Sequence, residues 1–273
     1  MTSSLPIVRS PRTRLARASA GVWLKRLPLQ LCVQAARDAT RIPRWPETAV
    51  HAMRGSLKKL QSLVRLLPPG PGPAPLQALR AALRQLKAAL APQRDYSVRL
   101  ALDRKLGRKA RPRSARAAAA VAPLGLARAL TPRVRALDLA GLGWDELAQR
   151  FRKTSHRARQ AWKSARSRPS VDSFLDWRKW IKDLHYQSLA LHRWLRRRKI
   201  LRGTHQLVAL LGRRLDLDWY AARLTREQRR PSRALVTEVD GRRSRLTRRI
   251  FRRAQQLFSH PLPRFEPPVS KRR

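Results

Sequence analysis

The fold of this chain is decided by the stretch VHAMRGSLKKLQSLVRLL, which covers residues 50–67. Apolar side chains recur in it every three or four residues, which is the spacing of one face of a helix. They are Met53, Leu57, Leu60, Val64 and Leu67. A second set keeps the same spacing about 100° further round the helix axis, and it consists of His51, Arg54, Lys58, Gln61 and Arg65. The stretch therefore predicts a helix that carries a core face beside a cationic face.

The stacked positive charges on this helix need an explanation. Like charges three or four residues apart destabilise a helix by roughly a few tenths of a kcal/mol per pair. A bound polyanion would offset this repulsion. Taken alone, the helix is also compatible with an ordinary bundle helix whose charged face is solvated, and for a single helix this is the simpler interpretation.

The same helical periodicity recurs through the rest of the chain, and the alternation typical of strands is nearly absent. It predicts helices over residues 22–40, 47–67, 74–90, 94–107, 144–167, 172–199, 204–224 and 240–259. Residues 108–122 are low in complexity and are compatible with helix or loop, and residues 68–73 form a connector rich in proline and glycine. The predicted fold class is all-α, with a basic disordered arm at 1–20 and a basic, proline-rich tail at 261–273.

The chain of 273 residues is strongly basic, with 63 Lys and Arg against 16 Asp and Glu and a net charge of +47. Hydrophobic residues make up 42%, which is enough for a packed core and excludes wholesale disorder. Charge of this size predicts polyanionic partners rather than a fold. Because 51 of the basic residues are arginines, which bind phosphate oxygens in a bidentate manner, a phosphate-bearing partner is favoured. Nucleic acid, another polyphosphate chain and an anionic membrane surface all remain open.

The cysteine content and the shortness of the apolar stretches bear on the cellular compartment in which we expect the protein. Cys32 is the only cysteine, which excludes an internal disulfide and a cysteine-based zinc site. It lies in an apolar run and is interpreted as a small buried residue. No stretch approaches the roughly 18 apolar residues of a membrane span. We therefore expect a cytoplasmic protein that needs no cofactor or metal.

An internal repeat emerges when the chain is compared with itself. Residues 51–58 align with residues 175–182 at an offset of 124. The matched basic pairs are Arg54 with Arg178 and Lys58 with Lys182. In the next helix the offset is 121, and Leu86, Leu90 and Asp95 align with Leu207, Leu211 and Asp216. Similar shifts in two consecutive helices predict two related halves, about 21–122 and 140–260, within one helical domain.

The second half presents a cationic stripe of its own. Arg178, Lys182 and His185 have the helical spacing, and Tyr186 follows with a hydroxyl that can donate to a phosphate oxygen. A core stripe runs beside them and consists of Trp177, Ile181, Leu184 and Leu191. Two cationic stripes that face one another across a groove or channel would focus the electric field and attract a linear anion.

These motifs resemble the signatures of the CHAD domain, the conserved histidine α-helical domain. The first half carries Val50-His51-Ala52-Met53-Arg54, then Lys58-Lys59-Leu60, then Arg94-Asp95-Tyr96-Ser97-Val98. The second half carries Arg178, Lys182 and Tyr186, then Leu211-Gly212 with Asp216. The resemblance covers about residues 25–225 and departs from the family pattern at three positions. Leu175 replaces the second signature histidine, and Gln61 and His185 stand where the family usually has arginine.

The resemblance implies two four-helix bundles related by a pseudo-two-fold axis, with a basic central channel between them. It also implies binding of inorganic polyphosphate and location on polyphosphate granules. In the first half, the implied phosphate-binding residues are His51, Arg54, Lys58, Lys59, Arg65 and Arg94. In the second half, they are Arg178, Lys182 and Tyr186, and we add His185, Lys179 and Arg213 as further candidates on the same helices.

Two other classes of function are weighed against polyphosphate binding. The first is non-specific nucleic-acid binding through the same basic surface and tails, with Tyr186 and Trp194 placed for base stacking. Packing is nevertheless the simpler interpretation of the tryptophans on predicted helices, which are Trp177, Trp180, Trp194 and Trp219. The second class is an enzyme. The acids that a metal-dependent phosphohydrolase needs are dispersed, and Asp95 and Asp216 are interpreted as structural, so we expect no catalysis.

Overall fold

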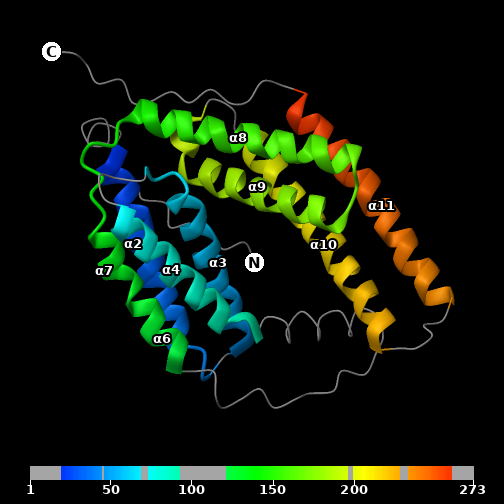
Figure 1. Cartoon of the computed structure of the whole chain (residues 1–273), viewed down its shortest axis with the longest axis horizontal. Coiled ribbons are helices and arrows are strands. Elements are labelled where there is room, and N and C mark those ends of the chain that lie inside the picture. Colours follow the sequence, from blue (N-terminus) through cyan, green and yellow to red (C-terminus); the bar gives the residue numbers. More distant parts are fainter. Residues whose placement is uncertain are drawn as a thin grey trace. The chain divides into compact units, whose positions relative to one another are not determined.

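A computed structural model of the chain describes residues 20–44, 46–68, 73–92, 121–195, 199–227 and 233–259. Within these ranges the regular structure is entirely helical (Figure 1), which confirms the all-α prediction. The helices are α2 (Ala20–Thr40), α3 (Pro46–Val64), α4 (Pro73–Ala89), α6 (Val121–Arg128), α7 (Leu130–Arg135), α8 (Trp144–Ser167), α9 (Val171–Ala190), the 3₁₀ turn η1 (His192–Trp194), α10 (Lys199–Glu227) and α11 (Arg233–Phe258). Within these ranges, no helix combines the length and the apolar character needed to cross a membrane.

Most predicted helices are confirmed, and the prediction for residues 144–167 coincides with α8. The single helix predicted over 172–199 is wrong, because α9 ends at Ala190 and α10 begins at Lys199. The chain turns there so that α10 can return and pack on α9. No glycine or proline marks this turn in the sequence. The helix predicted at 94–107, nearly all of the 108–122 stretch and both basic ends lie outside the described residues.

Helices α6 and α7 occupy a region for which no helix was predicted. They have 8 and 6 residues, which is too short for a clear apolar period. Each also contains a proline near its start, Pro123 in α6 and Pro132 in α7. Proline is tolerated in the first turn of a helix, where its missing N–H has no partner to lose.

The chain divides into two compact units, one comprising Met1–Leu147 with Pro268–Arg273 and the other Ala148–Pro267. In the first unit, α2 packs on α3, α6 and α7, and α4 packs on the same three helices. The apolar stripe of α3, from Met53 to Leu67, is buried as predicted. Cys32 on α2 is also buried, which raises the pKa of its thiol to about 12. It is therefore the small core residue that the sequence predicted.

One glycine in the first unit is required by a close approach. A Cβ atom added to Gly21 on α2 would lie 1.7 Å from the carbonyl oxygen of Leu139, which is backbone and cannot move aside. Nearby, Lys25 Nζ donates a hydrogen bond of 2.7 Å to the carbonyl oxygen of Leu137. These two contacts hold the segment after α7 against α2.

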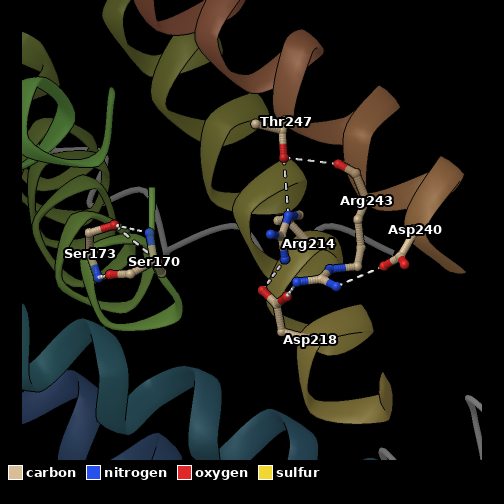
Figure 2. A network of polar contacts seen from close by, with 7 residues as sticks. All are labelled: Ser170, Ser173, Arg214, Asp218, Asp240, Arg243 and Thr247. Carbon is tan, nitrogen blue, oxygen red and sulfur yellow. Dashed lines mark hydrogen bonds and ion pairs between the residues drawn. The ribbon is translucent and has the colours of Figure 1, made fainter. Parts of the chain in front are cut away.

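The second unit has an aromatic core in which α11 takes part. Trp177 of α9 stacks on Phe251 of α11 with a centroid distance of 6.0 Å, and Trp162 of α8 stacks on Phe258 at 5.2 Å. Helix α9 begins with a capping box in which Ser170 and Ser173 exchange hydrogen bonds (Figure 2).

The four tryptophans on predicted helices differ in their exposure to solvent. Trp177 and Trp194 are buried, which confirms packing for both and contradicts base stacking for Trp194. Trp180 is half-buried and lies under the cations of Arg157 and Lys179. The packing interpretation is wrong for Trp219, which is 41% exposed.

Candidate functional site

Three basic residues of α3, together with Gln61 and with Arg65 directly after the helix, form a face separate from the core. His51 and Arg65 are exposed, whereas Arg54, Lys58 and Gln61 are half-buried. We call these five residues the α3 stripe. All of them avoid the buried apolar stripe beside them, as the spacing predicted.

Within the α3 stripe, Arg54 contacts the segment that follows α4. Its Nη1 donates a hydrogen bond of 3.4 Å to the carbonyl oxygen of Leu90, directly after the end of α4. Carbonyl groups at a helix C-terminus have no partner within the helix and carry partial negative charge. The end of α4 therefore orients the guanidinium of Arg54.

In the second unit, Arg178, Lys182, His185 and Tyr186 of α9 are all half-buried, and we call them the α9 stripe. The guanidinium of Arg178 lies against α10 at Gly212, where a Cβ atom would come within 3.3 Å of Arg178 Nη2. Gly212 thus leaves room for the arginine to lie close to the backbone of α10.

The two arginine contacts correspond to each other through the repeat. Arg54 matches Arg178, and Leu90 matches Leu211, the residue before Gly212. Each signature arginine therefore lies against the next helical segment of its own unit, at positions that are one residue apart in the repeat. The sequence repeat is thus also a repeat of side-chain position.

Tyr186 keeps its proton in this environment. Burial raises the pKa of its phenol above the usual value, Arg178 lowers it and the buried Asp183 raises it further. The hydroxyl therefore stays a hydrogen-bond donor at neutral pH.

His185 is held by α10. Its Nδ1 lies 3.0 Å from Oγ1 of Thr204, and its ring centroid lies 5.5 Å from that of His205. The contacts of Arg178 with Gly212 and of His185 with Thr204 show that α9 and α10 run antiparallel. Thr204 carries no motif in the sequence, and only the return of α10 brings it to His185.

Three other predicted phosphate-binding residues, Lys59, Lys179 and Arg213, do not belong to the stripes. Lys59 is buried on another face of α3, where it borders a cavity of about 670 Å³ with Asp38 of α2. Burial lowers the pKa of Lys59, and Asp38 offsets part of this effect. Lys179 is exposed and forms an ion pair of 3.9 Å with Asp176, and Arg213 is exposed on α10. Arg94 lies outside the described residues.

A polar network between α10 and α11 was missed by the sequence analysis (Figure 2). The buried carboxylate of Asp218 forms ion pairs with Arg214, one turn earlier on α10, and with Arg243 of α11 at 2.8 Å. Arg243 also pairs with Asp240 at 2.8 Å, and Arg214 Nε donates to Thr247 Oγ1 at 3.1 Å. The four-residue spacing of Arg214 and Asp218 was visible in the sequence, but the arrival of Arg243 was not.

Of the two acids that the sequence suggested to be structural, Asp95 and Asp216, only Asp216 is among the described residues. Asp216 is half-buried on α10, and its structural role stays a prediction, while Asp95 lies outside the described residues. In the described ranges, no three His, Cys, Asp or Glu side chains come close enough together to hold a metal ion.

Comparison with known proteins identifies the architecture. The family model described as CHAD domain matches residues 29–225. The crystal structure of the CHAD domain from the plant Ricinus communis is similar to this chain with a TM-score of 0.60. The two sequences are 18% identical, and the match covers 92% of this chain and 96% of that one. At this identity the likeness shows the fold alone. No curated protein matches the chain.

Proposed function

Because the chain belongs to the CHAD domain family, we propose that it binds inorganic polyphosphate without catalysing its turnover. The observation that carries this proposal is the duplicated arginine. Arg54 and Arg178 each belong to a stripe of mostly basic residues, and each lies against the next helical segment of its own unit. A repeated site suits a ligand that is itself a repeat of identical anionic groups.

The chemistry of the stripes fits phosphate. Arginine forms charge-assisted, bidentate hydrogen bonds to phosphate oxygens, and lysine adds point charge. Tyr186 supplies a neutral donor beside Arg178. Except for Arg65, the lysines and arginines of both stripes are half-buried, so their charges are screened less than fully exposed ones. Each stripe by itself offers cations to several phosphate groups of a long polyphosphate chain, and association with polyphosphate granules is part of the proposal. The channel implied by the resemblance stays a prediction.

Non-specific nucleic-acid binding is the second candidate, and the outer face of α11 favours it. Arg245, Arg248, Arg249 and Arg252 are exposed there. The described part of the chain provides no ion pair for any of the four. Such a face attracts any polyanion, including the phosphate backbone of a duplex.

A competition experiment separates the two candidates. The experiment is done at about 0.15 M salt, where a screening length of roughly 8 Å weakens diffuse attraction. Long-chain polyphosphate should displace bound single-stranded or duplex nucleic acid at a lower phosphate concentration than nucleic acid needs to displace bound polyphosphate. Affinity should fall steeply with salt because counterions are released. Equal competition per phosphate would overturn the polyphosphate proposal. Release of orthophosphate in the presence of Mg²⁺ or Mn²⁺ would overturn the absence of catalysis.

The contact of Arg178 with Gly212 gives a further test. In the Gly212→Ala variant, the new methyl group must displace the guanidinium of Arg178 by a few tenths of an ångström. A side chain pushed off its preferred rotamer costs about 0.5–1.5 kcal/mol, so we expect polyphosphate affinity to fall by up to about tenfold. Isothermal titration at fixed salt measures this change.

Gly55→Ala is the matched control on α3. A Cβ atom at Gly55 meets nothing within 4 Å, although it stands next to Arg54 in the sequence. Alanine should stabilise α3 by roughly 0.5–1 kcal/mol relative to glycine and leave binding unchanged. Equal losses of affinity in the two variants would mean that the position of Arg178 does not matter.

A further inference from the structure

We infer that Thr204 fixes the tautomer of His185, so that His185 can contact a phosphate only after it has taken up a proton. Binding at the α9 stripe is then coupled to protonation. This inference rests on the proposed function for the identity of the ligand. The tautomer itself is a property of the free protein.

The argument begins with the single hydrogen of the Thr204 hydroxyl. Oγ1 of Thr204 lies 2.7 Å from the carbonyl oxygen of Ile200 and 3.2 Å from that of Leu201, and the residue is fully buried. A carbonyl oxygen can only accept, so the hydroxyl hydrogen points to one of these two carbonyls. Oγ1 can then only accept from Nδ1 of His185, which lies 3.0 Å away. Nδ1 of His185 therefore carries a hydrogen.

This constraint decides what Nε2 of His185 can do. A neutral imidazole has one N–H, and here it is on Nδ1, so Nε2 presents a lone pair. A phosphate oxygen is an acceptor and is repelled by that lone pair. Only the imidazolium, which has N–H groups on both nitrogens, can donate from Nε2 to phosphate. Arg178 and Lys182 keep their charge across the neutral range and have no such requirement.

Described residues of α9 and α10 face His185. On α9 they are Lys182, one turn away, and Tyr186, with a ring centroid 5.4 Å from that of His185. On α10 the facing group is His205, and α11 approaches α10 nearby through the apolar side chain of Leu257 at Gly203. A bound polyanion brings negative charge to the α9 stripe and favours the protonated form of His185.

Binding therefore raises the pKa of His185, and the sign of the pH dependence follows. Affinity is highest where His185 is protonated in the free protein, and it falls as pH rises toward the pKa of the complex. Each unit by which binding raises this pKa weakens affinity by about tenfold across the transition.

The test compares three proteins at about pH 5.5 and about pH 8, on either side of the ordinary imidazole pKa of roughly 6.5. We expect the unmodified chain to lose about tenfold more affinity for polyphosphate between these values than His185→Arg, which stays charged. His185→Gln should bind weakly at both. Calorimetry in buffers of different ionisation enthalpy should show smaller proton uptake for both variants. Equal pH dependence of the unmodified chain and His185→Arg would overturn the inference.

Two further variants isolate the role of Thr204. Thr204→Val removes the acceptor for Nδ1, so a neutral His185 can place its hydrogen on Nε2. Affinity near pH 8 should then be retained better than in the unmodified chain. His205→Gln, which alters the neighbouring imidazole, should leave the pH dependence in place. Loss of the pH dependence in His205→Gln, or no change in Thr204→Val, would contradict the assignment.

Nitrogen-15 NMR of the free protein separates this inference from the proposed function. Neutral His185 should show a protonated Nδ1 and an unprotonated Nε2. The opposite tautomer would overturn the inference even if polyphosphate binds. Failure of polyphosphate to bind at any pH, with the expected tautomer present, would overturn the proposed function instead and limit the inference to the free protein's tautomer.

Discussion

Replacing Arg54 and Arg178 together by alanine is expected to lower the affinity for long-chain polyphosphate by about a hundredfold or more. Hydrogen bonds that involve a charged partner contribute about 1.5–3 kcal/mol each, and the variant removes one such group from each stripe. Both guanidinium groups are positioned by a neighbouring helix, so their loss also removes preorganised geometry. Titration at constant salt measures the effect, after thermal unfolding has shown that the variant is folded.

A matched variant separates organised from diffuse charge. Arg245→Ala combined with Arg249→Ala also removes two positive charges, but from the exposed outer face of α11. We expect its affinity to fall by less than about tenfold, because exposed charges are screened and contribute little. Deletion of residues 261–273 should also have a small effect. If these changes weaken binding as much as the loss of Arg54 and Arg178, then the charge acts diffusely and the stripes are not a site.

The largest effect on stability is expected for Asp218→Asn, which should lower the free energy of unfolding by about 3–5 kcal/mol. Asp218 is the buried counter-charge for both Arg214 and Arg243. Without it, Arg214 remains with a side chain that is only 10% exposed and has lost its ion pair. The chain as a whole is strongly positive, which adds to the cost of an unpaired buried charge. Urea unfolding followed by tryptophan fluorescence measures the change.

Asp240→Asn is the control for this prediction. Asp240 pairs with the same Arg243 at 2.8 Å, but its side chain is 56% exposed. An exposed ion pair contributes about 0–1 kcal/mol, so the variant should unfold at nearly the same urea concentration as the unmodified chain. Similar destabilisation by both substitutions would show that burial of Asp218 is not what makes the network important.

Much of the fold follows from local periodicity. The buried stripe from Met53 to Leu67 and the bounds of α8 could be predicted because each depends on residues three or four apart in the same helix. The turn after Ala190 could not, since the sequence there continues to favour helix and only packing of α10 on α9 ends it. Helices α6 and α7 could not be predicted for a different reason, because they are too short to show a helical period.

The candidate site, too, could be predicted only in part from the sequence. Composition and spacing by themselves predicted a polyanionic partner, and they determined the cationic faces of α3 and α9. The repeat also identified Arg54 and Arg178 as equivalent residues. Tertiary structure alone decided which cations share a face with them: it placed Lys59 beside Asp38 instead.

Tertiary structure also brought Thr204 to His185 and Arg243 to Asp218. The physical reason is the range of the interactions. A helix face is set by neighbours within two turns of the chain, whereas a hydrogen bond or buried ion pair between helices depends on residues 19 or more positions apart. Only the folded chain brings such residues together.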